Sequence, residues 1–352
     1  MKKAVGPHLL LAIAATVVPL LGLEAALRHG LVDPYRQFTR EYNPGVRLNG
    51  PKDAGTVRIV ALGDSMTAGR DGYPRLLERR LAALAPGPSY QVLNLAVPGV
   101  DPSVYYKRLI TIGQRWEPAV ILVGVYVGND IAGFRNPYDP KTLSTDLYYA
   151  MKMSSHLAAF IKTRLDFARS VLAPPTPYRS PIPPGPGNKQ EYVSTVSPYL
   201  VDEAKQHPRY LLDTLSLSHQ SFQESLAAML ATLRLIDRQC RSIRATALFI
   251  VIPAAVQIHQ DYHPFYRSIG FAVSARLLTE AAVQEEMRAF FVDNGLRFLD
   301  LLPPLRATAR EYFYYMNDDH WNGRAKAFVA DLIARTLLER GLLGRPQAGE
   351  RQ

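Results

Sequence analysis

The stretch "IVALGDSMTAG", Ile59 to Gly69, decides the fold. Its apolar run ends abruptly at Gly63, and Ser65 follows where the chain turns toward a helical pattern. Such a run is typical of a buried strand in an open α/β sheet, and these sheets bind their ligands at the carboxyl ends of the strands. A lone serine at such a turn often does no more than cap the next helix. Ser65 therefore indicates chemistry only if reactive groups also follow neighbouring strands.

Four more short apolar runs follow along the chain, each bounded by turn residues. With the first, they cover residues 57–62, 90–96, 119–126, 245–253 and 296–301. Runs that are continuously apolar predict parallel strands covered on both faces. Because helical patterns separate these runs, we expect a doubly wound three-layer α/β/α fold with a five-stranded parallel sheet.

The N-terminal 30 residues have the pattern of a membrane anchor. Lys2 and Lys3 precede "LLLAIAATVVPLLGLEAAL", in which Glu24 is the only charge. This length is close to the roughly 20 residues that cross a bilayer, and the charge bias places the N-terminus in the cytoplasm. We predict an uncleaved single-pass transmembrane helix in the inner membrane, with the rest of the chain on the periplasmic side. A cleaved signal peptide and a buried N-terminal helix are the alternatives.

The rest of the chain divides by composition. Residues 31–55 are polar, contain Pro and Gly, and have no apolar periodicity, which favours a linker. Residues 56–345 form the predicted catalytic domain, interrupted by an insertion at residues 131–217 that contains "APPTPYRSPIPPGPGNKQ". Helical spacing on both sides of this Pro-rich run predicts a partly helical cap over the carboxyl edge of the sheet.

Composition excludes some classes of protein. The formal charge is +10 and the pI is about 9.6, but Lys and Arg are scattered and no basic tract is interleaved with aromatic residues. Nucleic-acid binding is therefore not expected, whereas attraction to anionic lipid or to an acidic polymer is. Cys240 is the only cysteine, so neither an intrachain disulfide nor a thiolate metal cluster can form.

Candidate functional residues also follow the other predicted strands, as a chemical role for Ser65 requires. Gly99 follows the second strand, where its backbone N–H can approach a ligand closely, and "GVYVGNDI" ends the third. After the fifth strand, "YFYYMNDDHWNG" supplies two acids and a histidine. The candidates are Ser65, Gly99, Asn129, Asp318, Asp319 and His320. Cleavage of an ester by a serine needs a base, an acid that orients the base, and N–H donors for the oxyanion, and these residues meet all three needs.

The same blocks carry a resemblance to a family. "GDSMTAG", a downstream glycine, "GND" and a terminal acid–histidine pair resemble the SGNH (GDSL-type) hydrolase superfamily, whose blocks occur in this order on a flavodoxin-like sheet. The resemblance covers residues 57 to about 338. It implies that Ser65 is the nucleophile and that His320 is the base. The oxyanion hole would consist of the N–H groups of Ser65 and Gly99 and the side chain of Asn129.

The acid of this triad departs from the commonest family pattern. That pattern has an acid three residues before the histidine, where this chain has Asn317. The spacing of Asp318, His320 and Trp321 is similar to a variant of envelope polysaccharide O-acetyl esterases and acetyltransferases, so Asp318 is the predicted acid. Asp319 is expected to point elsewhere and to cap the last helix with Asn322.

The sequence thus predicts a serine esterase that works through an acyl-enzyme without a metal or an organic cofactor. Its expected substrate is an acetylated or acylated carbohydrate of the cell envelope or an exported one, and a lipid ester or thioester is left open. The alternatives are an O-acetyltransferase with the same triad and a non-catalytic envelope scaffold. His259 and His263 have the spacing of metal ligands, but Pro264 argues against a helix there and no third ligand is evident.

Overall fold

The computed structural model describes residues 6–46, 48, 52–131, 150–151, 153–161, 164–165, 190–308 and 311–344. These residues form two compact units. The first contains the described parts of residues 1–36 and 141–174, and the second contains those of residues 37–140 and 175–352.

A sheet of five parallel strands in the order β2-β1-β3-β4-β5 forms the centre of the second unit. The strands are β1 (Thr56–Leu62), β2 (Ser89–Asn94), β3 (Val120–Tyr126), β4 (Thr246–Ile252) and β5 (Phe298–Asp300). Every residue of β3 and β4 is buried, as expected for strands covered on both faces. The predicted strands and the flavodoxin-like order are confirmed.

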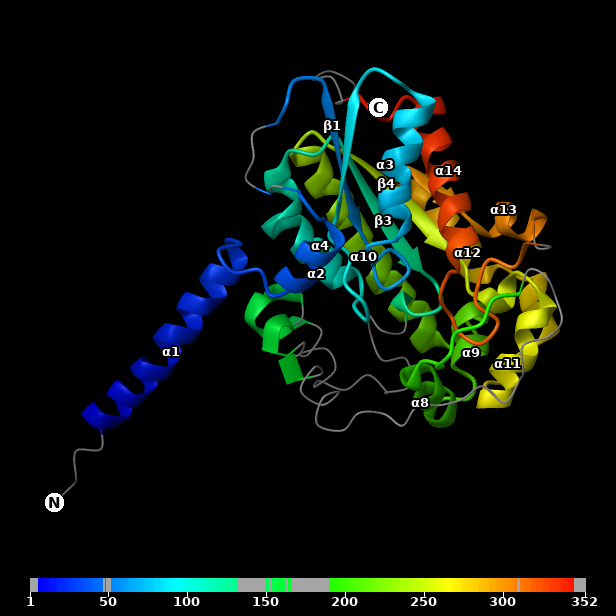
Figure 1. The fold of residues 1–352 in the computed structure, drawn as a ribbon. Helices are drawn as coiled ribbons and strands as arrows, with labels where there is room; N and C mark the ends of the chain where they lie inside the picture. Colours follow the sequence, from blue (N-terminus) through cyan, green and yellow to red (C-terminus); the bar gives the residue numbers. More distant parts are fainter. Residues whose placement is uncertain are drawn as a thin grey trace. The chain divides into compact units, whose positions relative to one another are not determined.

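Helices lie on both faces of this sheet (Figure 1). α3 (Tyr73–Leu84) and α14 (Gly323–Glu339) pack against each other on one face, and α4 (Pro102–Thr111) and α10 (Gln220–Ser242) pack on the other. The other helices of this unit are α2 (Arg36–Tyr42), α8 (Pro198–Gln206), α9 (Tyr210–Ser216), α11 (His263–Ile269), α12 (Ala282–Asp293) and α13 (Leu302–Ala307). Short 3₁₀ helices cover Gly113–Trp116, Ala255–Gln257, Gln260–Tyr262 and Ala275–Leu278.

The helical pattern over residues 272–294 is broken, although the sequence reads as one helix. Only Ala275–Leu278 and α12 are helical, because the Arg306 guanidinium binds the carbonyl oxygens of Leu277 and Glu280 at 3.0 and 3.1 Å. An uninterrupted helix would use those carbonyls for its own i→i+4 bonds.

The described part of the insertion is partly helical, since residues 198–206 and 210–216 form helices and residues 190–197 do not. α8 packs against α11, which follows the carboxyl end of β4, and α9 packs against α12. The Pro-rich run lies outside the described residues, apart from Gln190.

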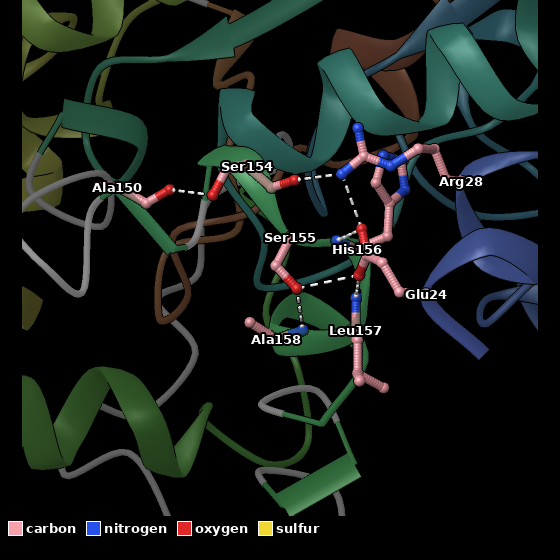
Figure 2. Close-up of polar contacts among 8 residues, drawn as sticks. All are labelled: Glu24, Arg28, Ala150, Ser154, Ser155, His156, Leu157 and Ala158. Carbon is pink, nitrogen blue, oxygen red and sulfur yellow. Dashed lines mark hydrogen bonds and ion pairs between the residues drawn. The ribbon is translucent and has the colours of Figure 1, made fainter. Parts of the chain in front are cut away.

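The first unit contains α1 (Gly6–Arg28) and short helical pieces within residues 150–165. Figure 2 shows how the Glu24 carboxylate links them: it accepts hydrogen bonds from Leu157 N at 2.6 Å, His156 N at 3.1 Å and Ser155 Oγ at 3.0 Å. Arg28 donates to Glu24 at 2.9 Å and to the Ser154 carbonyl at 2.8 Å. Glu24 thus occupies the free N–H groups at the start of the helix that begins at His156.

The predicted transmembrane helix is not supported. Among the described residues, no helix combines the length and the apolar character needed to cross a membrane. The segment expected to span contains Pro19 and holds Glu24 and Arg28 in polar contacts within its last turns. The location of the chain at the inner membrane stays a prediction from the sequence.

The predicted linker is wrong for residues 36–46, which fold onto the sheet unit. Tyr42 of α2 packs with Ala68 and Ala96. The Asn43 side chain donates to Asn94 O at 2.8 Å and accepts from Asn94 N at 2.7 Å, so it pairs with the last residue of β2. The contacts of Phe38, Tyr42 and Asn43 thus fold this stretch, although its composition is rich in turn residues.

Candidate active site

Ser65 lies in a tight turn at the carboxyl end of β1. The backbone oxygen of Asp64 accepts from Ala68 N at 3.0 Å, and its carboxylate accepts from Met66 N at 2.9 Å. Thr67 is fully buried and fills the space above Gly63 and Gly124, where a Cβ on either glycine would collide with it. This contact packs the turn closely against Gly63 and Gly124, and the packing holds Ser65 at the predicted carboxyl edge of the sheet.

The structure brings Ser65, His320 and Asp318 together. His320 Nε2 lies 2.9 Å from Ser65 Oγ, and His320 Nδ1 lies 3.0 Å from Asp318 Oδ2, both in hydrogen-bonding geometry. The histidine comes from the loop before α14, 255 residues away along the chain. A hydroxyl, an imidazole and a carboxylate in this order form the relay that activates a serine nucleophile.

Asp319 also lies beside the imidazole, contrary to the prediction that it would point away. Its Oδ1 is 3.0 Å from His320 Nδ1 without hydrogen-bonding geometry. The turn at residues 316–320 places both carboxylates around one ring nitrogen. The predicted helix cap is made by Asn322 alone, whose side chain accepts from Ala325 N at 3.1 Å.

The two carboxylates dominate the electrostatics of the site. Burial lowers the pKa of His320, but the charge of Asp319 and the hydrogen bond and charge of Asp318 outweigh it and raise that pKa above its usual range. Burial raises the pKa of Asp318. Burial also acts to raise the pKa of Asp319, but the nearby charge of His320 acts in the opposite direction, and the pKa is lowered overall. The imidazolium that forms when Ser65 loses its proton is thereby stabilised.

The predicted oxyanion donors lie around the same turn. Val97 N donates to Gly63 O at 3.0 Å, which places the loop containing Gly99 beside the serine motif. Gly99 has a φ of 69° and is exposed, so its backbone adopts a left-handed conformation that favours glycine. The Asn129 amide lies close enough to Asp64 to lower the pKa of that carboxyl. The roles of Gly99 and Asn129 stay predictions.

Two buried acids, Asp64 and Asp130, lie near these groups, and Asp64 had no role assigned from the sequence. Burial raises the pKa of Asp64 to about 6. Asp130 accepts from Tyr126 N at 2.9 Å and from Tyr105 OH at 2.9 Å, so it holds the turn after β3, as expected. The sequence motif could have indicated this role for Asp64. An aspartate directly before the serine is placed to accept a hydrogen bond from the backbone two residues later, as in an Asx-turn.

Among the described residues, the only group of side chains that could hold a metal ion belongs to the triad region. Donor atoms of Asp318, Asp319 and His320 lie within 4.8 Å of one another. His259 and His263 do not form a site: His263 Nε2 bonds the Val256 carbonyl at 2.9 Å, and His259 accepts from Asp261 N at 3.1 Å. In the described geometry His320 Nδ1 is already hydrogen-bonded to Asp318, which favours the relay over a metal centre.

A family model matches the carboxyl-terminal part of the chain. Residues 210–351 match the family described as "SGNH hydrolase-like domain, acetyltransferase AlgX". This match extends over less than half of the chain's 352 residues. The matched part of the chain contains Asp318 and His320, whereas Ser65, Gly99 and Asn129 precede it.

Solved structures are similar to this chain only at low sequence identity. An acetyl xylan esterase, AlAXEase, is 12% identical with a TM-score of 0.42, over 80% of this chain and 100% of that one. A lipase/acylhydrolase from Enterococcus faecalis is 14% identical with a TM-score of 0.42, over 83% and 100%. A catalytic mutant of Axe2, an acetylxylan esterase from Geobacillus stearothermophilus, is 12% identical with a TM-score of 0.42, over 84% and 97%. No curated protein is significantly similar to the chain. Its activity therefore has to be argued from its own residues.

Proposed function

We propose that this protein transfers acyl groups from ester substrates through an acyl-enzyme on Ser65. The observation that carries the proposal is the unbroken relay from Ser65 Oγ to His320 Nε2 at 2.9 Å and from His320 Nδ1 to Asp318 at 3.0 Å. Ser65 Oγ attacks the acyl carbonyl while His320 takes its proton. The oxyanion that forms is held by the N–H groups of Ser65 and Gly99 and by Asn129. His320 then protonates the departing alcohol.

The second half of the reaction has two possible acceptors. Water, deprotonated by His320, would release the free acid, and this hydrolysis is the function that we propose first. A sugar hydroxyl in the same position would instead receive the acyl group, and the description of the matched family as an acetyltransferase favours this second candidate. Both use the same residues up to the acyl-enzyme.

We propose an acetylated carbohydrate of the cell envelope, or an exported one, as the substrate. The spacing of Asp318, His320 and Trp321 supports this choice, as does the formal charge of +10, which would attract an acidic polymer. A lipid ester is the competing substrate. The predicted absence of cofactors and of nucleic-acid partners belongs to the same proposal.

The test is release of p-nitrophenol from p-nitrophenyl acetate by the full chain. Ser65→Ala is expected to abolish turnover and to prevent the gain of one acetyl mass that wild type shows when the reaction is quenched early. Ser89→Ala is the control, because Ser89 begins β2 at the opposite edge of the sheet. Equal turnover by wild type and the Ser65 variant would refute the proposal.

Hydrolysis and transfer are separated by adding an oligosaccharide acceptor to the same reaction. Free acetate as the only product supports the hydrolase. Acetyl esters on the acceptor, formed at the expense of acetate, support the transferase.

A further inference from the structure

The segment of residues 190–193, within the predicted insertion, lies directly against the loop that carries the triad acid. Val193 N donates to Asn317 Oδ1 at 2.8 Å, and Asn317 Nδ2 donates to Val193 O at 2.9 Å. Met316 N donates to Glu191 O at 2.7 Å. Asn317 is 3% exposed and directly precedes Asp318. One buried side chain thus satisfies both backbone groups of Val193.

Only an amide side chain can make this pair of bonds. An aspartate at position 317 would accept from Val193 N, but its second oxygen would face the Val193 carbonyl with no hydrogen between them. Two buried acceptors in contact are unfavourable, and the carbonyl would lose its partner. Asn317, which departs from the commonest family pattern, is therefore the type of residue that can bind both backbone groups of Val193.

The side chains of this segment join a polar and aromatic surface beside the triad. Tyr192 OH donates to Gln190 Oε1 at 3.1 Å, and the Gln190 side chain also bonds the hydroxyl of Tyr312. Tyr312 in turn donates to Asp261. All four side chains are partly exposed. Phenol rings together with amide and carboxylate groups suit a ligand with both hydroxyl groups and apolar ring faces.

The residues that carry this surface are linked to the loop of the reacting groups. Met316 N, two residues before Asp318, donates to Glu191 O at 2.7 Å, and the charges of Glu191 and Asp318 both act on Tyr315, whose pKa burial raises. Tyr315 N also donates to the His320 carbonyl at 3.1 Å. A substrate whose ester reached Ser65 would therefore have the rest of its chain within reach of residues 190–193.

We propose that Asn317 is a positioning residue that holds residues 190–193 as a wall of the site, against which the carbohydrate part of the substrate binds through Gln190 and Tyr192. This inference rests on the proposed function, and it names where that function gains its specificity. Asn317 does not touch the reacting atoms in this scheme. Its effect should therefore depend on the size of the substrate.

The experiment compares two substrates on the full chain: p-nitrophenyl acetate, which is too small to reach the wall, and a chemically O-acetylated cello-oligosaccharide. Asn317→Asp is expected to raise KM for the oligosaccharide about tenfold and to leave kcat/KM for the small ester within about twofold of wild type. Gln190→Ala and Tyr192→Ala, which leave the backbone clamp intact, are expected to show the same split. They keep the inference testable if Asn317→Asp does not fold.

Asn294→Ala is the matched control. It removes another amide-to-backbone hydrogen bond, to Phe290 O at 2.8 Å, near the amino end of β5 and away from the catalytic edge. Both substrates should be processed as by wild type. Equal losses for both substrates in the Asn317, Gln190 and Tyr192 variants, or no loss for either, would overturn the inference.

Failure of the proposed function gives a different result. If wild type turned over neither substrate, calorimetric binding of the oligosaccharide would still test the wall. Binding that Asn317→Asp weakens about tenfold supports it. Equal binding by the variant, or no binding by wild type, contradicts it.

Discussion

His320 Nδ1 lies 3.0 Å from an oxygen of Asp318 and 3.0 Å from an oxygen of Asp319, and this sets how the site responds to pH. A general base must be neutral to accept the proton of Ser65. Because the two carboxylates raise the pKa of His320, kcat/KM for p-nitrophenyl acetate is expected to rise with pH through the neutral range into the alkaline range.

Replacing the acids one at a time separates their roles. Asp319→Asn removes the largest effect that raises the pKa of His320, so the rising limb of the pH profile should move to lower pH while the plateau stays close to that of wild type. Asp318→Asn should instead lower the plateau by about a thousandfold or more, because the hydrogen bond that orients the imidazole changes. A larger loss of plateau activity in Asp319→Asn would reverse the assignment of the acid.

Asn129 is the proposed oxyanion donor whose side chain can be removed by one substitution. Losing such a donor costs roughly a hundredfold to a thousandfold in kcat, so Asn129→Ala is expected to show that loss. Its melting temperature should be close to that of wild type, since Asp130 continues to hold the turn through Tyr105 and the backbone of Tyr126. Unchanged kcat would remove Asn129 from the role.

At the scale of elements, the end of β1 depends on close contact between a glycine and a threonine. A Cβ at Gly63 would lie 2.7 Å from Thr67 Cβ, and Thr67 is fully buried. Gly63→Ala must therefore displace the turn that carries Ser65. We expect a loss of about 1–3 kcal/mol in the free energy of unfolding, as overpacking costs elsewhere, together with reduced kcat. Gly344→Ala is the control, because a Cβ there would lie in open space and its φ is not positive. A fully stable and active Gly63 variant would refute this account.

The link between α1 and the helix beginning at His156 depends on the charge of Glu24. Burial acts to raise the pKa of Glu24, but hydrogen bonds from Leu157, His156, Arg28 and Ser155 lower it from 4.5 to about 2. Its contribution to stability is therefore present above about pH 4.5 and is lost as the pH falls toward 2. Amide exchange of residues 155–158 should become faster over that range.

The same amides test the link at neutral pH. Glu24→Gln should speed their exchange to the rate that wild type shows after acidification, because the amide oxygen is a weaker acceptor than the carboxylate. The variant is not expected to change exchange within β3 or β4. Equal protection in wild type and Glu24→Gln would show that the carboxylate does not hold this helix.

The elements differ in how far the sequence predicts them, for physical reasons. Strands such as Val120–Tyr126 are continuously apolar, and α3 has clear helical spacing, so local pattern suffices. The break before α12 depends on Arg306, which lies far along the chain. Likewise, Phe38 and Tyr42 fold the predicted linker onto the sheet through contacts that composition does not show. Ser65, His320 and Asp318 are found from their motifs, whereas the approach of Asp319 and the clamp of Asn317 depend on the conformation of one turn.

For the whole molecule, the formal charge of +10 predicts how substrate association depends on salt. Long-range attraction between a basic protein and an acidic polymer is screened as ionic strength rises. Raising NaCl from about 50 mM to about 500 mM should lower kcat/KM several-fold for an acetylated polyuronate, because the Debye length shortens from over 10 Å to under 5 Å.

The control is a neutral polysaccharide acetylated to the same density, for which kcat/KM should stay nearly constant over the same range of salt. p-Nitrophenyl acetate carries no charge and should also be insensitive, which shows that salt leaves the relay of Ser65, His320 and Asp318 intact. Were the neutral and the acidic polymer to lose activity equally, the positive charge would have no part in substrate choice. Specificity would then have to come from local contacts such as those of Gln190 and Tyr192, and variants of those two residues would change KM for both polymers alike.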